Sequence, residues 1–239
     1  MQSPFKSIAD ELFKNQIKHN KGRYDLKIPL GGSARLNWIG SKHWALLQNT
    51  MVKKFGNEYY VQDYYASKIW GHIFASNVSS IVKTKRIMAE MLSLISEHLG
   101  FGKIETLKLG YGQDWATLRF YDSPIARESA KLYGSFDGSI DYSICGLVAG
   151  SAENVLKRKF MNIETKCIAS GDPFCEFQTV SLEKAKKIID KIENKKQKEI
   201  CEKILELDKK TDFAKLSKDL VAKQNKKELL KEANYFQND

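Results

Sequence analysis

The 239-residue chain has no apolar run long enough to cross a membrane. Its longest apolar runs, such as GLVAG at residues 146–150, fall far short of the ~20 residues that a membrane-spanning helix needs. The sequence begins with an acidic pair, Asp10 and Glu11, where a signal peptide would need an apolar core. We therefore expect a cytoplasmic protein.

The sequence also lacks the glycine-rich fingerprints of nucleotide and hydride-cofactor sites. No Gly-x-Gly-x-x-Gly joins an expected strand to a helix, and no Gly-Lys-Ser/Thr loop is present to cradle a phosphate. A reductase that acts alone needs a place for its reductant. The absence therefore argues against such an enzyme, unless a partner protein or another electron donor supplies the electrons.

Cysteine is scarce, with four residues at uneven spacing, whereas secreted disulfide frameworks are denser. In a reducing compartment, Cys167 and Cys175 are expected to be free thiols or metal ligands rather than a disulfide. Cys201 lies in a Lys/Glu-rich helical stretch and is expected to be a bystander.

The net charge of +10 is the one compositional feature that suggests nucleic acid as a partner. However, lysines and acidic residues alternate along residues 181–239, as they do on a solvated helix surface. The sequence shows no zinc-finger spacing, aromatic RNA-binding signature or helix-turn-helix. Nucleic acid is therefore not the expected main partner, although the basic surface leaves non-specific attraction open.

The expected elements are typical of an α+β fold, with an antiparallel sheet packed against helices. Apolar residues at helical spacing predict helices over residues 1–21, 41–55, 60–74, 84–99 and 141–158. Alternating patterns predict a strand at 24–28 and hairpins over 103–122 and 160–181. One long helix is expected through residues 188–207, with shorter ones after it. The domain boundaries follow as an N-terminal helix (1–21), a main domain (22–180) and a charged helical extension (181–239).

Three residues of the second expected hairpin carry ligand chemistry: Glu164, Cys167 and Cys175. Between the two cysteines, the sequence Gly171-Asp172-Pro173 favours a tight turn, because glycine accepts positive φ and proline fixes its own φ. Such a turn would bring a carboxylate and two thiolates together, and zinc accepts both ligand types. Alternatively, the cysteines are small buried apolar residues of the core.

A second candidate site is an apolar pocket for a flat or hydrocarbon ligand, because the helical region is rich in aromatic residues. Ordinary core packing explains the same pattern. The candidate pocket residues are Trp44, Tyr64, Trp70, His72, Phe74 and Trp115. His72 or Tyr64 would serve as a polar handle for the ligand.

The stretch GLVAG…ETKCIASGDPFCEF is similar to the closing motif of the 4-vinyl reductase domain family, Gly-x-x-x-Gly followed by Glu-x-Lys-Cys-x-x-x-Gly-x-x-x-Cys-x-Phe. The matching residues are Gly146, Gly150, Glu164, Lys166, Cys167, Gly171, Cys175 and Phe177. Looser agreement extends the resemblance over residues 22–180 and leaves out the first helix and the helical extension.

The resemblance implies an α+β fold related to heme nitric-oxide sensors and TRAPP transport-particle subunits, and it implies frequent homodimers. The family is named for a proposed role in reducing a vinyl group during bacteriochlorophyll synthesis. Many relatives are instead ligand sensors, including input domains of bacterial activators that respond to aromatic hydrocarbons.

Those input domains hold a structural zinc with Cys, Glu, Cys and Cys, which implies that Glu164, Cys167 and Cys175 are three of the ligands. When the Gly-x-x-x-Gly segments are aligned, the position of the family's first cysteine falls on Asp141. Cys145 lies one helical turn further along. The fourth ligand is therefore Asp141, Cys145, water or none.

These observations favour a cytoplasmic domain that binds a small hydrophobic or aromatic ligand and carries a structural zinc. Two alternatives stay open. The first is an enzyme or accessory factor in tetrapyrrole vinyl-group reduction. The second is a regulatory adaptor that acts through the helical extension.

Overall fold

The computed structural model describes residues 17–20, 23–28, 32–36, 41–81, 84–110 and 115–223. The first three ranges form an antiparallel sheet of β1 (Ile17–Asn20), β2 (Arg23–Ile28) and β3 (Gly32–Leu36). The strand expected at 24–28 is confirmed as β2. The helix predicted over residues 1–21 lies largely outside the described residues, and Ile17–Asn20 within its range is strand β1.

Three helices follow: α2 (Ser41–Phe55), α3 (Glu58–Ile81) and α4 (Lys85–Ser96). They confirm the three helices predicted between residues 41 and 99, and α3 is longer than its apolar pattern indicated. A π-helical turn, η1 (Glu97–Phe101), continues α4 and leads into the main sheet.

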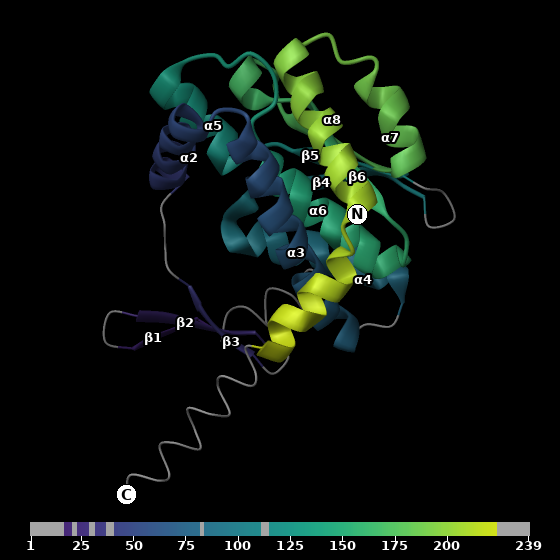
Figure 1. Cartoon of the computed structure of the whole chain (residues 1–239). Coiled ribbons are helices and arrows are strands. Elements are labelled where there is room, and N and C mark those ends of the chain that lie inside the picture. Colours follow the sequence, from purple (N-terminus) through teal and green to yellow (C-terminus); the bar gives the residue numbers. More distant parts are fainter. Residues whose placement is uncertain are drawn as a thin grey trace, which may run out of the picture.

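The main sheet has four antiparallel strands in the order β4-β5-β7-β6. Figure 1 labels three of them, β4, β5 and β6. Both predicted hairpins are present, as β4 (Ile104–Leu109) with β5 (Trp115–Phe120), and β6 (Phe160–Lys166) with β7 (Cys175–Ser181). The hairpins join through β5 and β7, where Leu118 lies opposite Phe177 and Ala116 opposite Thr179.

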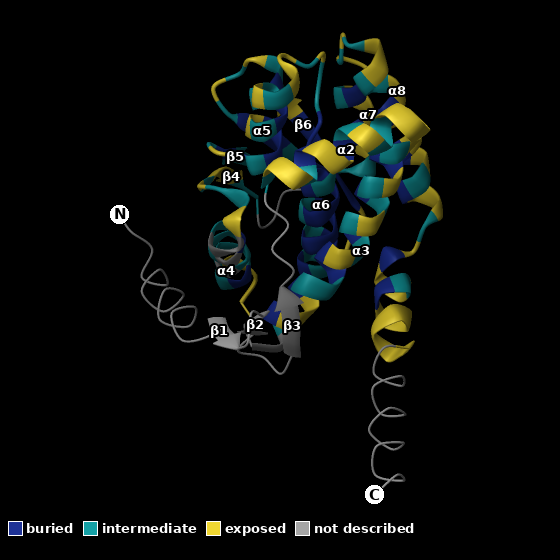
Figure 2. Cartoon of the chain, turned by 90° about the vertical axis from the view of Figure 1, so that its left-hand side faces the viewer, coloured by how far each residue is buried: buried dark blue, intermediate teal, exposed yellow. Residues whose placement is uncertain are grey.

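Two helices separate the hairpins. The first, α5 (Pro124–Tyr133), was not predicted, although Ser123 as N-cap with proline at the first helical position is a typical helix start. The second, α6 (Tyr142–Leu156), confirms the helix expected over 141–158. Most of α6 is buried, because it packs against α3 on one side and against β6 and β7 on the other (Figure 2).

The single long helix predicted through residues 188–207 is wrong. Two helices occupy this stretch, α7 (Leu182–Ile189) and α8 (Lys195–Lys210). The break has a local cause, because the side chain of Asn194 accepts a hydrogen bond from the Gln197 amide at 2.8 Å and caps the start of α8. Helical periodicity alone could not reveal that cap, since the isoleucines continue in phase across it.

Helices α7 and α8 belong to the same core as the main sheet. Ile189 on α7 and Ile200 and Ile204 on α8 are each 1% exposed, in one apolar cluster with Ile163 and Phe177 of the sheet. The first part of the predicted extension therefore covers the face of β6 and β7 that α6 leaves free.

The motif Gly146-x-x-x-Gly150 allows α3 and α6 to pack backbone to backbone. A Cβ at Gly150 would lie 2.1 Å from the carbonyl oxygen of Lys68, and one at Gly146 would lie 2.3 Å from that of Tyr64. These distances are far below van der Waals contact, so only glycine fits at the crossing.

Replacing Gly150 with alanine is expected to lower the free energy of unfolding by about 3 kcal/mol, because the backbone of α3 must shift to admit the methyl group. Gly56→Ala is the matched control. It places a Cβ in open space and adds only the strain of φ +62°, about 1 kcal/mol. Urea unfolding measures the stability loss of each variant. Equal midpoints for the two variants would refute the claim that the α3–α6 crossing requires glycine at position 150.

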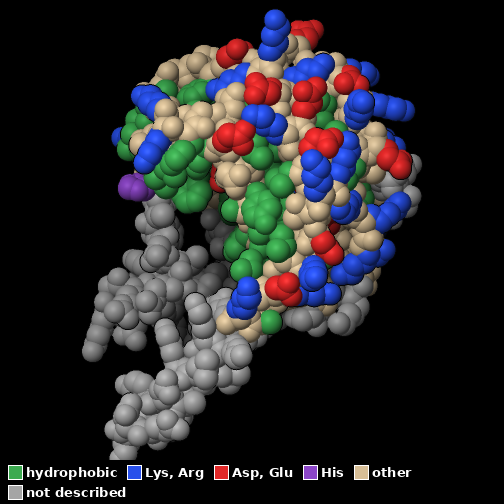
Figure 3. Space-filling view, viewed as in Figure 1, with side chains coloured by type: hydrophobic (Ala, Val, Ile, Leu, Met, Phe, Trp, Pro, Cys, Tyr) green, Lys and Arg blue, Asp and Glu red, His purple; other side chains and the backbone are tan. Residues whose placement is uncertain are grey.

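Charged side chains of both signs are intermixed on the face of the molecule that includes α7 and α8 (Figure 3). This mixture agrees with the alternation seen in the sequence and contrasts with a continuous basic patch. Among the described helices, none is both long enough and apolar enough to cross a membrane.

Candidate metal centre and ligand cavity

Glu164, Cys167 and Cys175 converge at the turn end of the β6–β7 hairpin. One ligand atom from each lies within 4.8 Å of those of the other two, and all three residues are buried. A short 3-10 turn, η2 (Ile168–Ser170), reverses the chain, and Gly171 follows with φ +96°. The Asp172 carboxylate accepts a hydrogen bond from the Cys167 amide at 2.9 Å, which fixes the turn.

The start of α6 holds the Glu164 carboxylate in place. Glu164 Oε2 accepts hydrogen bonds from the backbone amides of Ile140 and Asp141, at 3.2 and 3.1 Å. Glu164 Oε1 is buried and has no hydrogen-bond partner among the described residues. That oxygen is therefore free to bind a cation.

Asp141, the residue before α6, also belongs to this group of side chains. Asp141 Oδ2 lies 3.6 Å from Cys175 Sγ and accepts a hydrogen bond from the Ser123 hydroxyl at 2.5 Å. Asp141 Oδ1 is buried without a partner in the described part of the chain. Cys145 is also buried, but among the described residues no hydrogen bond joins its thiol to either cluster thiol. Of the two candidates for a fourth ligand, Asp141 is the one in contact with a cluster thiol.

The pKa values of the cluster are shifted, because its carboxyl and thiol groups are buried close to one another. Burial raises the pKa of Glu164 well above its usual range, and the neighbouring Cys167 and Asp141 raise it further. Burial likewise raises the pKa of Asp141 to about 6, although hydrogen bonds from Ser123 and Cys175 oppose the shift. A hydrogen bond between the two thiols lowers the pKa of Cys167 and raises that of Cys175.

Such a cluster needs either protons or a cation, because buried carboxylates and thiolates repel one another and lose their hydration. Two carboxylates and two thiols form a donor set that suits Zn²⁺, which takes four ligands of these types in structural sites. The two unpartnered oxygens, Glu164 Oε1 and Asp141 Oδ1, are further observations that fit a missing cation.

A cavity of about 460 Å³ lies between α4, α6 and the inner face of the main sheet. That size is within the range of small-molecule sites. The apolar lining comes from all three sides, and its members include Leu92, Phe101, Ile104, Leu118, Phe120, Leu147, Val148 and Val155. The metal cluster borders the cavity wall, because Phe120 of that wall lies opposite Cys175 in the sheet.

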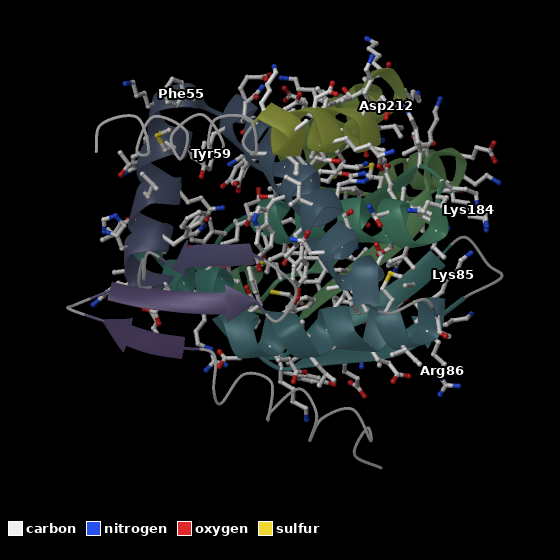
Figure 4. The ribbon with its side chains drawn as sticks, turned by 90° about the horizontal axis from the view of Figure 1, so that it is seen from below. Phe55, Tyr59, Lys85, Arg86, Lys184 and Asp212 are labelled. Carbon is white, nitrogen blue, oxygen red and sulfur yellow. The ribbon has the colours of Figure 1, made fainter. Side chains whose placement is uncertain are left out.

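The rim of the cavity is charged. Arg86 Nε lies 3.2 Å from Glu90 Oε1 one turn along α4, and the Arg86 side chain is 74% exposed. Figure 4 shows Lys85 and Arg86 at the start of α4, on the opposite side of the molecule from Phe55 and Tyr59. In this pair the charges of Arg86 and Glu90 compensate each other.

The structure brings one of the six predicted pocket residues, Phe74, to this cavity. Trp70 stacks on Phe74 with ring centroids 5.2 Å apart but is itself 45% exposed. Trp44 lies on α2, and its buried Nε1 has no partner among the described residues. Trp115 begins β5, and its side chain lies outside the described part of the chain.

Tyr64 and His72 are part of a buried ionic network centred on Lys68. The Tyr64 hydroxyl donates to Asp208 Oδ2, and His72 Nε2 lies 2.8 Å from Glu153 Oε2. Lys68 Nζ lies 2.7 Å from Asp208 Oδ1 and 2.8 Å from Glu153 Oε1, and its side chain is fully buried. This network joins α3, α6 and α8.

The two carboxylates of the network have opposite shifts. Burial raises the pKa of Asp208 to about 6, although Lys68 and Tyr64 oppose the shift. Burial also acts to raise the pKa of Glu153, but the His72 hydrogen bond and the Lys68 charge outweigh it and lower the pKa. The charge of the Glu153 carboxylate is thus better compensated than that of Asp208, because Glu153 accepts hydrogen bonds from His72, Lys68 and the Phe160 amide.

Comparison with known proteins gives a short sequence match. No protein-family model matches the chain. An uncharacterized protein from Methanocaldococcus jannaschii is 53% identical over 32 residues, which are 13% of this chain and 18% of that protein. The match therefore spans about a fifth of the relative's length.

The solved structures give a longer match. The phenol-responsive sensory domain of the transcription activator PoxR, solved with phenol, matches 76% of this chain and 92% of its own, with a TM-score of 0.65 and 15% identity. A vinyl-4-reductase family protein from Methanocaldococcus jannaschii matches 75% of this chain and 95% of its own, with a TM-score of 0.41 and 20% identity. The first comparison shows that the chain has the fold of the sensory domain, as the resemblance to the 4-vinyl reductase domain family implied.

Proposed function

We propose that this chain is a sensor domain that binds a small hydrophobic or aromatic molecule in the cavity between α4, α6 and the main sheet. The observation that carries the proposal is the apolar cavity of about 460 Å³. The fold shared with a phenol-responsive sensory domain supports it. Apolar burial supplies most of the binding free energy in such a site, and a few polar groups orient the ligand.

The proposal includes a structural zinc held by Glu164, Cys167, Cys175 and Asp141. These residues come from β6, the hairpin turn, β7 and the start of α6, so the ion would tie the hairpin to the helix that lines the cavity. A complete set of four protein ligands gives zinc a structural role, because catalysis needs an open coordination position.

Ligand binding is expected to raise the melting temperature of the purified protein by roughly 5–10 °C at about 100 times the dissociation constant. The probes are phenol, naphthalene, larger planar hydrocarbons and a vinyl tetrapyrrole. Ala152→Phe should abolish the shift, because Ala152 lines the cavity and a phenyl ring would fill it.

Ala66→Phe on the exposed face of α3 is the matched control and should keep the full shift. If the melting temperature of the wild-type protein rises with none of these probes, the proposal is refuted. A shift confined to the tetrapyrrole would favour vinyl-group reduction instead. The homodimer and any contact with nucleic acid stay predictions.

A further inference from the structure

Asn162 and Thr179 form a buried polar pair on the inner face of the main sheet. They lie opposite each other on β6 and β7, and Asn162 Nδ2 donates to Thr179 Oγ1 at 2.7 Å. Both residues are almost fully buried, at 2% and 3% exposed. Thr179 lines the ligand cavity.

The hydrogen bonding of this pair is incomplete. Thr179 Oγ1 accepts from Asn162, so the threonine keeps its own hydroxyl proton for another acceptor. Asn162 Oδ1 is buried and has no partner among the described residues. Buried polar groups in folded proteins are normally paired, so a pair with an unused donor at the wall of an apolar cavity needs an explanation.

Other polar side chains of the cavity lining are already engaged, apart from Thr106, which is exposed to water. The hydroxyls of Ser93, Ser96 and Ser151 donate to the backbone carbonyls of Ala89, Leu92 and Gly71. The Glu97 carboxylate accepts from the Ile104 amide, and Arg86 pairs with Glu90. Among the buried polar side chains of the lining that the structure describes, the Thr179 hydroxyl is therefore the one whose proton is available to donate a hydrogen bond to a ligand.

Apart from Asn162, the part of the cavity that contains Thr179 has apolar members. Ala116 lies opposite it on β5, and Val155 and Phe160 also line the cavity. A hydrogen bond in such surroundings does not compete with water, so it discriminates strongly between ligands that can accept it and ligands that cannot.

We propose that the Thr179 hydroxyl, oriented by Asn162, is the polar anchor of the cavity, and that the ligand is an apolar molecule with an oxygen acceptor, a carbonyl or a hydroxyl. The inference rests on the proposed function, because it concerns the same cavity. It makes Thr179 a specificity-determining residue that separates oxygenated ligands from hydrocarbons of the same shape.

Two isosteric probes test this anchor: 2-acetylnaphthalene, which carries a carbonyl, and 2-isopropenylnaphthalene, which replaces the oxygen with a methylene. Titration calorimetry gives both dissociation constants for the wild-type protein and for Thr179→Val. The preference for the ketone, expressed as the ratio of the two constants, should fall about fivefold in the variant. Thr179→Ser keeps the hydroxyl and should keep the preference.

Thr179→Val alone strips Asn162 of its remaining partner and can destabilise the fold, so the double variant Asn162→Leu, Thr179→Val is measured as well. Replacing both partners with apolar groups of similar shape is close to neutral for stability. The double variant should bind 2-isopropenylnaphthalene at least as well as the wild type does, and it should lose the preference for the ketone. If both probes bind and the ratio is the same in all four proteins, the anchor is refuted and the proposed function stands. If neither probe binds the wild type, the anchor is refuted, and the proposed function is then decided by the melting-temperature probes alone.

Discussion

Changing Cys175 to serine is expected to reduce the zinc content of the purified protein from about one ion per chain to nearly none. Serine is a poor zinc ligand, and Cys175 supplies one of the three ligand atoms that lie within 4.8 Å of one another. Because metal binding contributes to folding, the variant should also melt at least about 10 °C lower. Elemental analysis and thermal unfolding of protein purified without chelators measure the two effects.

Two further variants decide the fourth ligand. Asp141→Asn should lower zinc content or affinity strongly, since Asp141 lies against Cys175 and carries a free buried oxygen. Cys145→Ser should keep the zinc, because the Cys145 thiol is not among the ligand atoms that lie within 4.8 Å of one another and, unlike Asp141, it forms no hydrogen bond with a cluster thiol in the described part of the chain. The opposite pattern would transfer the ligand role to Cys145. Wild-type protein that contains no zinc when freshly purified would contradict the metal site altogether.

The metal cluster was predictable because its geometry is local. Glu164 and Cys175 are separated by one hairpin, and the sequence between them encodes the turn that folds one back on the other. The choice between Asp141 and Cys145 was not predictable, because it depends on how α6 is rotated about its axis. That rotation depends on contacts between distant parts of the chain, such as those of Gly146 and Gly150 with α3, some 80 residues away.

The cavity was far less predictable. The sequence pattern predicts a lining of mainly aromatic residues, four of them on α3, but a helix that packs on several neighbours has several buried faces. Phe74 points to the cavity, whereas Tyr64 and His72 point to the ionic network. The lining residues of α6 and β5 are small or aliphatic apart from Phe120, and nothing in their own periodicity separates a cavity wall from ordinary core.

Replacing Lys68 with methionine is expected to lower the free energy of unfolding by about 3–5 kcal/mol. Methionine matches the length of the lysine stem, so the packing loss is small. What is lost is the charge that compensates Asp208 and Glu153, both of which stay in the interior. Lys203→Met is the matched control. Lys203 also bridges two elements, α8 and Glu58 of α3, but it is 41% exposed, and such surface pairs contribute less than about 1 kcal/mol.

The same network explains what removal of the helical extension would do. Deleting the chain after Val180 takes away Asp208 together with Ile200 and Ile204, and so leaves Lys68 with one carboxylate and an uncovered sheet face. The truncated protein is therefore expected to be unfolded or aggregated rather than a free-standing ligand-binding domain. A truncated protein with a cooperative melt near that of the full chain, or a Lys68→Met variant no less stable than Lys203→Met, would show that α8 is dispensable to the core. Combining Lys68→Met with Asp208→Leu should recover part of the loss, because an apolar pair of similar volume no longer buries a charge without its partner.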